Sequence, residues 1–150
     1  MKKTVLPLAL TLLLALPAAP RLLAQAKHEH KEPDTELGKI MEKVGHSWRA
    51  IRKQVDDPAK NAATLEEVAA IKAGLEKGLA LTPERAADVP AAEREKFVES
   101  FRSHLKEFIG LVDQLDAALK ANDNAAAAAL VKKMGSAQHE DHKEFRRPDE

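Results

Sequence analysis

The chain has 150 residues, with 24 Lys and Arg against 24 Asp and Glu, six His and no Cys. This length allows one domain of ordinary size, and the balanced charge excludes a strongly basic nucleic-acid-binding protein. The absence of cysteine excludes disulfides, thiolate metal sites and cysteine nucleophiles. Charged residues make up 32% of the sequence. With abundant Ala and few β-branched residues, this composition predicts an all-α fold.

The first 26 residues have the pattern of a secretory signal peptide. Lys2 and Lys3 precede an apolar run over residues 5–16, and residues 24–26 form an A-x-A cleavage site. The apolar run is too short to span a bilayer, which takes roughly 20 residues. We therefore expect export to the periplasm, followed by a polar tail over residues 27–34. Beyond residue 26 the chain has 21 basic and 24 acidic residues, which argues against binding nucleic acid or associating stably with anionic membranes.

Two helices are predicted in the first half of the remaining chain. The first covers residues 35–55 and carries an apolar stripe on one face. The stripe consists of Leu37, Ile40, Met41, Val44, Trp48, Ile51 and Val55. The second helix is expected to begin at a capping box formed by Thr64 and Glu67 and to end before Pro83.

Two further helices are predicted in the second half. The third covers residues 91–121 and follows Pro90, which suits a helix start. Its stripe includes Phe97, Phe101, Leu105 and Phe108. The fourth follows a break at residues 122–124, and its stripe contains Leu130, Val131, Met134, His142 and Phe145. Because short connections make neighbouring helices antiparallel, we predict an up-down-up-down four-helix bundle over residues 35–147.

Met41 and His142 are expected at the same end of this bundle, each within roughly 10 Å of it. Because Val131 and His142 are eleven residues apart, they share nearly the same angle on the helix, so we expect His142 to face the core. A thioether and an imidazole that meet in an apolar interior can hold haem iron, and the phenylalanines near this end could line a porphyrin. The alternatives are that Met41 fills the core and that His142 is a helix-end residue.

Three segments resemble the cytochrome b562 family: LGKIMEKV at residues 37–44, DQLDAAL at 113–119 and HKEFR at 142–146. The resemblance covers nearly all of the chain from Leu37 onward. It implies an up-down-up-down bundle and a periplasmic b-type cytochrome that holds haem b noncovalently and exchanges electrons with redox partner proteins. It also implies that Met41 and His142 are axial ligands and that Phe108 lies against the porphyrin. Arg146 would lie on the same helix face as His142 and could meet a haem propionate.

Two positions depart from the family pattern. His104 stands where the family usually has an aromatic residue against the haem, so a second imidazole could lie near the iron as an alternative ligand to Met41; the other interpretation is a partly exposed histidine. Gln138 stands where an Arg is usual, and it cannot make a charged contact.

Other histidines suggest capture of copper or zinc as a different function. Residues 27–30, KHEH, would form the mature N-terminus, and His139 and His142 are three residues apart. A helical chaperone is a third alternative, but it requires an exposed apolar face, whereas the four stripes here are expected to cover one another. We find no nucleophile motif or phosphate-binding loop, and therefore predict a non-enzymatic protein, expected to be a monomer.

Overall fold

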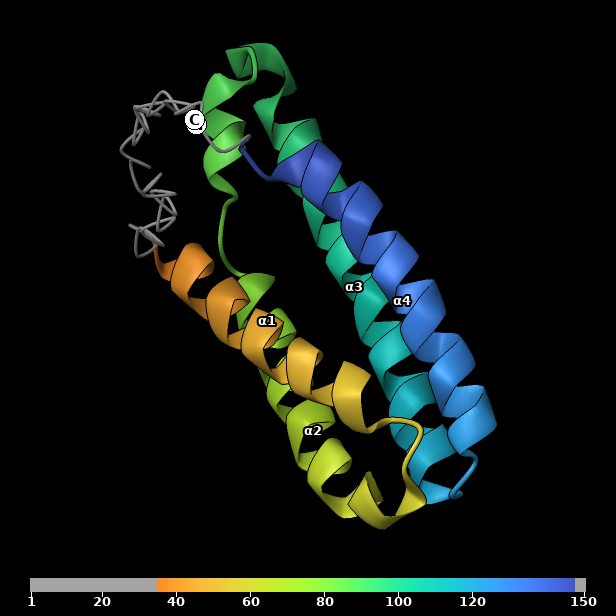
Figure 1. Ribbon diagram of the computed structural model, residues 1–150. Helices are drawn as coiled ribbons and strands as arrows, with labels where there is room; N and C mark the ends of the chain where they lie inside the picture. Colours follow the sequence, from red (N-terminus) through yellow and green to blue (C-terminus); the bar gives the residue numbers. More distant parts are fainter. Residues whose placement is uncertain (1–34, 148–150) are drawn as a thin grey trace, which may run out of the picture. The chain divides into compact units, whose positions relative to one another are not determined.

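The computed structural model describes residues 35–147, which fold into a four-helix bundle (Figure 1). Its long helices are α1 (Glu36–Gln54), α2 (Asn61–Gly78), α3 (Arg94–Lys120) and α4 (Asn124–Phe145). This range contains no strand and no helix apolar enough to cross a membrane. The predicted all-α fold is therefore confirmed, whereas the predicted signal peptide and polar tail lie outside the described residues.

Helix α1 begins where its sequence predicts. The Thr35 hydroxyl caps the helix by accepting a hydrogen bond from the Gly38 N–H at 3.1 Å, which satisfies a backbone donor that has no partner inside the helix. The buried side of α1 carries Leu37, Trp48 and Ile51. The apolar stripe of the sequence is thus the face that α1 buries.

The start of α2 differs from the predicted capping box. A 3-10 turn over Pro58–Lys60, capped by Asp57, leads directly into a helix that begins at Asn61. Thr64 therefore lies inside the first turn, fully buried, and its hydroxyl donates to the Lys60 carbonyl at 2.9 Å. The predicted cap at Thr64 was wrong because Asp57 and Pro58 start helical structure earlier in the chain.

The connection between α2 and α3 contains two further 3-10 turns, Glu84–Asp88 and Ala91–Glu93. The second turn follows Pro90, so α3 begins at Arg94 and not at residue 91 as predicted. The Arg94 side chain donates hydrogen bonds to the carbonyls of Val89, at 2.9 Å, and Ala87, at 3.2 Å. These bonds hold the connection against the start of α3.

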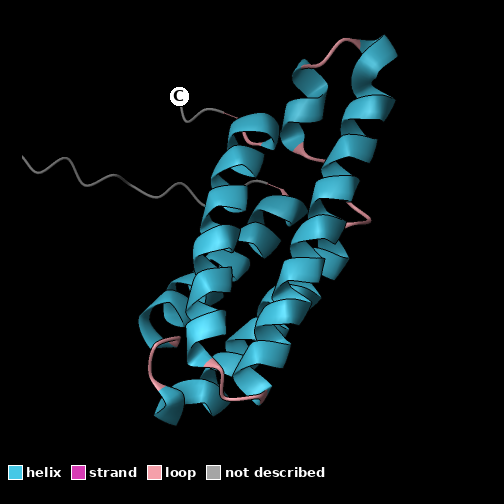
Figure 2. Cartoon of the chain, turned by 90° about the vertical axis from the view of Figure 1, so that its right-hand side faces the viewer, coloured by secondary structure: helices cyan, strands magenta, loops and turns pink. Residues whose placement is uncertain are grey.

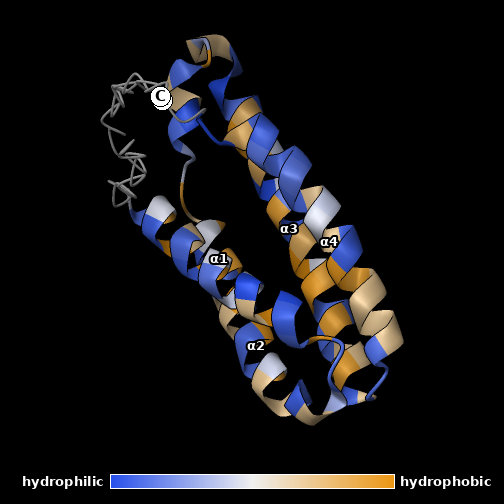
Figure 3. Ribbon diagram, viewed as in Figure 1, coloured by the Kyte–Doolittle hydropathy of each residue, from blue (hydrophilic) through white to orange (hydrophobic). Residues whose placement is uncertain are grey.

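Each helix packs mainly on the next helix in the sequence: α1 on α2, α2 on α3 and α3 on α4 (Figures 1 and 2). The backbones of α1 and α4 come close at very few points by comparison. The fully buried side chains at the centre of the bundle include Ile51, Ile71, Leu115, Leu119 and Met134. Hydrophobic residues dominate the first half of α4, and its second half is mostly hydrophilic (Figure 3).

Helix α1 lies very close to α2 because α2 presents two glycines to it. The ideal Cβ position of Gly74 is 2.6 Å from a methyl group of Val44, and that of Gly78 is 3.1 Å from the terminal methyl group of Met41. Both distances are shorter than ordinary van der Waals contact, so the two glycines leave the space in which side chains of α1 lie.

Side-chain amides join the α1–α2 and α3–α4 connections, at the end of the bundle where α1 and α3 finish. Asn61 donates to the side-chain oxygens of Asn122 and Asn124, both at 3.1 Å. Asn124 donates in turn to the Val55 carbonyl at 2.7 Å. Asn122 has a positive φ of 54°, a conformation that Asn tolerates better than most residues. This end is thus closed by hydrogen bonds between the α1–α2 and α3–α4 connections.

Candidate functional site

Met41 lies in the first half of α1, half-buried against the core. Its terminal methyl group approaches the backbone of Gly78 in α2, and side-chain methyl groups of Leu37 and Leu105 lie beside the same position. A long, unbranched thioether suits such an irregular apolar space. The structure therefore gives Met41 an apolar environment shared by α1, α2 and α3.

His142 lies in the last turn of α4, and its side chain is exposed. The expectation that this side chain faces the core was therefore wrong. The buried residues of α4 are Ala127, Met134 and Phe145, and His142 is rotated by about 60° from Phe145 on the helix. Val131, from which its direction was predicted, is itself only half-buried. Val131 and His142 therefore lie on a face of α4 other than the buried one.

The environment of His142 favours the neutral imidazole. Partial desolvation, and then the positive charge of Arg146, hold the pKa of His142 below its usual value. Among residues 35–147 its ring has no hydrogen-bond or ion-pair partner. A neutral imidazole with one free ring nitrogen is the form of histidine that binds a metal.

An open groove of about 700 Å³ runs between α1 and α4. Its apolar residues are Trp48, Val55, Ala128 and Val131, and its polar residues include Arg52, Lys132, Gln138 and His139. Neither Met41 nor His142 lines this groove, but each continues one of its walls. Met41 is seven residues before Trp48, and His142 is seven residues after Gly135. Because seven residues bring a helix back to within about 20°, Met41 lies on the side of α1 that carries Trp48, and His142 on the side of α4 that carries Gly135.

His104 connects α3 to the helix that carries His142. Its Nδ1 donates to Oδ1 of Asp141 at 2.7 Å, and this bond raises the pKa of His104 above its usual value. The His104 ring also meets the ring of Phe145 edge-on, with centroids 5.1 Å apart. The structure thus places this second imidazole in contact with two residues that flank His142.

Three of the four phenylalanines form a cluster between α3 and α4. Phe145 contacts Phe97 and Phe101, with ring centroids 5.4 Å and 5.5 Å apart. Phe101 and Phe145 are buried, whereas Phe97 and Phe108 are half-buried and pack against the core. Of the four rings predicted to gather near the end of α4, these three do so, and their contacts join α3 to α4.

The end of α4 is also held by the connection between α2 and α3. Arg85 donates to the Lys143 carbonyl at 2.6 Å, and Arg147 donates two hydrogen bonds of 2.8 Å to the Asp88 carboxylate. Arg146 is exposed next to them, and its backbone N–H donates to the His142 carbonyl at 3.0 Å. Sequence reasoning identified Arg146 but missed Arg85, Asp88 and Asp141, because their partners lie 37 to 59 positions away in the chain.

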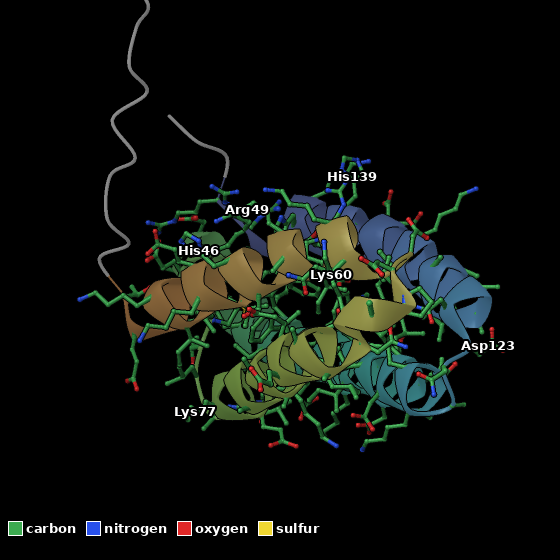
Figure 4. All side chains as sticks on the ribbon, turned by 60° about the horizontal axis from the view of Figure 1, so that its bottom comes forward. His46, Arg49, Lys60, Lys77, Asp123 and His139 are labelled. Carbon is green, nitrogen blue, oxygen red and sulfur yellow. The ribbon has the colours of Figure 1, made fainter. Side chains whose placement is uncertain are left out.

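The remaining histidines of the described chain lie apart from a common site. His46 is exposed on α1, and its Nδ1 accepts a hydrogen bond from Arg49 at 2.9 Å (Figure 4). His139 is exposed on α4, and its side chain points outward in the same view. Residues 35–147 contain no group of three or more His, Asp or Glu residues that could hold a metal ion. The predicted pair of His139 and His142 thus has no third ligand there, and residues 27–30 lie outside the described chain.

Comparison with known protein families decides what kind of bundle this is. The family model described as cytochrome b562 matches residues 36–146, from the first residue of α1 to just beyond α4. The chain belongs to the cytochrome b562 family. No curated protein and no solved structure matched the chain in the other two comparisons. Cytochrome b562 proteins are small four-helix bundles that bind haem b noncovalently and carry electrons, and they are typically periplasmic and non-enzymatic.

Proposed function

We propose that this protein is a periplasmic electron carrier that binds one haem b noncovalently between α1 and α4, with Met41 and His142 as the axial ligands. The observation that carries the proposal is the position of these two residues, each two turns along its helix from a residue that lines the groove. They continue the facing walls of the α1–α4 groove from opposite helices, so a flat group between the helices could meet a sulfur on one side and a nitrogen on the other.

The surroundings of both ligands fit this role. Met41 lies against Gly78 in an apolar space, and a thioether ligand needs such a water-poor environment to compete with water for iron. His142 has a lowered pKa and no hydrogen-bonded partner in the described chain, so binding a metal breaks no hydrogen bond of its ring. The open groove of about 700 Å³ lies about two turns further along both helices and is lined by neither ligand, so it supports only open space between α1 and α4.

The side chains around the ligands would determine how the haem is held. Bound haem supplies a reversible one-electron Fe(III)/Fe(II) couple. Phe97, Phe101, Phe108 and Phe145 would exclude water from the apolar edge of the porphyrin. Arg146, one turn after His142, would reach a propionate. Because the chain has no Cys, no thioether bond can form and the haem must be extractable.

Haem titration followed by absorption spectroscopy tests the proposal. We expect one equivalent of haem to bind and the reduced complex to give the sharp α and β bands of low-spin, six-coordinate iron. Acid–acetone should then remove all of the haem from the protein. A spectrum identical to that of free haem after addition of the protein would refute the proposal.

Single substitutions identify the ligands. His142→Ala should remove most haem binding, since a noncovalent haem depends on its axial bonds and on apolar burial together. Met41→Ala should be milder and leave five-coordinate or water-ligated iron with a lower potential, because a thioether stabilises Fe(II).

Two control variants separate loss of a ligand from loss of packing. His46→Ala removes an exposed imidazole from α1, and Met134→Ala removes a buried thioether from the centre of the bundle. Both should keep the low-spin bands at temperatures where the variant is folded. If Met41→Ala keeps the spectrum and the potential while a variant of His104 changes both, Met41 is not the sixth ligand.

A further inference from the structure

Two residues near His142, Asp141 and Phe145, attach the last turn of α4 to α3. Asp141 precedes His142 and accepts the 2.7 Å hydrogen bond from His104, whereas Phe145 lies one turn later and meets the His104 ring. Relative to His142, both residues are rotated in the same sense around α4, by about 100° and 60°. The side chain of His104 therefore contacts the face of α4 that lies next to the face carrying His142.

We propose that His104 is a positioning residue, which holds the last turn of α4 through Asp141 and Phe145 so that His142 points toward α1, and that it is not an iron ligand. The inference rests on the proposed function only in its assignment of His142 as a ligand. In this role His104 lies beside the haem site, and its ring does not bind the iron.

The other polar contacts at this end of α4 do not set the rotation of the helix in the same way, whereas the contacts of Phe145 with Phe97 and Phe101 restrain it together with His104. Arg85 binds a backbone carbonyl, and the Arg147–Asp88 pair lies beyond the end of α4. Both therefore fix where the helix ends. The contacts of His104 involve side chains that leave α4 in a defined direction, so they restrain its rotation about its own axis. They are also partly protected from water, because Phe145 is buried and only 25% of the Asp141 side chain is exposed.

The polar and apolar contacts of His104 can be separated by substitution. His104→Phe keeps an aromatic ring against Phe145 but removes the hydrogen bond and every nitrogen that could bind iron. His104→Asn retains an N–H donor at the position of Nδ1 and loses the ring. Asp141→Asn weakens the same bond from the α4 side. His46→Phe is the matched control, because it makes the same change at an exposed histidine whose partner, Arg49, lies on its own helix.

Amide hydrogen exchange of the haem-free protein tests the effect on α4 directly. The Arg146 N–H, which donates to the His142 carbonyl, should exchange about two- to tenfold faster in His104→Phe and Asp141→Asn, the range expected for loss of one partly exposed hydrogen bond. The increase should be smaller in His104→Asn and absent in His46→Phe. The Ala127 N–H in the first turn of α4 should be unaffected in all variants. Equal exchange at Arg146 in His104→Phe and His46→Phe would overturn the proposal.

Haem binding provides a second, spectroscopic readout. In His104→Phe the dissociation constant of haem should rise by about two- to tenfold, with partial recovery in His104→Asn, while the reduced α and β bands stay those of the unsubstituted protein. Loss of the low-spin bands in His104→Phe would identify His104 as a ligand and refute the positioning role. If the unsubstituted protein binds no haem, the proposed function fails, and the exchange comparison still decides whether His104 orders the end of α4.

Discussion

The substitution Gly74→Ala tests the close contact between α1 and α2 on which the position of Met41 depends. A Cβ at Gly74 would lie 2.6 Å from a Val44 methyl group and 3.5 Å from one of Ile40. Val is branched at Cβ and has one strongly preferred χ1 rotamer in a helix, so Val44 cannot easily swing away. The added methyl group must therefore push α1 away from α2, about one turn from Met41.

The size of this effect follows from two opposing contributions. Overpacking a tight contact costs about 1–3 kcal/mol, whereas replacing Gly by Ala inside a helix gains about 0.8–1 kcal/mol. We expect Gly74→Ala to lower the free energy of unfolding by about 1 kcal/mol. Gly110 in α3 provides the matched control, because no atom lies within 4 Å of its ideal Cβ. Gly110→Ala should therefore raise the free energy of unfolding by about 0.5–1 kcal/mol.

Urea unfolding of the haem-free variants, followed by far-ultraviolet circular dichroism, measures both changes. The two alanine variants should differ by about 2 kcal/mol at unchanged m-value, or by about 8 °C in Tm at roughly 4 °C per kcal/mol for a domain of this size. Gly74→Ala should also weaken haem binding, whereas Gly110→Ala should not. If both alanine variants are equally stabilised, α1 is not held against α2 by the contact at Gly74, and the reasoning is wrong.

Three further outcomes are expected. The pKa of His104 is raised by Asp141, so the pair should stabilise the haem-free fold fully below the ordinary histidine pKa of about 6.5 and lose this effect as pH rises through the raised value. NMR titration of His104 checks the raised pKa. Urea unfolding of Asp141→Asn should show a flatter dependence of stability on pH. Protons compete with iron for His142, so haem should dissociate as pH falls well below about 6.5, and a pH-independent haem spectrum between neutral and acid pH would contradict this ligand. Met134 is fully buried, so Met134→Ala should cost about 2–5 kcal/mol of stability in urea unfolding, and a cost near zero would mean that the core closes around the cavity.

The elements of this fold were predictable where local chemistry and periodicity agree. The stripe of α1 and the start of α4 after residues 122–124 could be found from the sequence, because Thr35 and Asp123 cap these helices as such residues usually do. The start of α2 could not, because Thr64 and Glu67 match a capping box while Asp57 and Pro58 begin the helix first. The sequence therefore contains two signals for the start of this helix, and it gives no basis for choosing between them.

The candidate site was predictable in its residue types but not in its contacts. Counting turns from Val131 showed that the two residues share a face of α4, but the expectation that this face is buried was wrong. That face borders the groove next to α1 and is not the buried face, which belongs to Ala127, Met134 and Phe145. The contact of His104 with Asp141 spans 37 positions, and helical periodicity carries no information about which side chain of another helix lies opposite.

The order in which the helices pack has a consequence for the kinetics of folding and of cofactor entry. Since each helix contacts mainly its neighbour in the sequence, the chain has few contacts between distant segments, and bundles of this kind fold in microseconds to milliseconds. Two helical hairpins, α1–α2 and α3–α4, can form first and then join through α2 and α3. In this order of events the groove between α1 and α4 forms only when the two hairpins join. A cofactor could then enter between α1 and α4, where the groove is already open, without the unwinding of any helix.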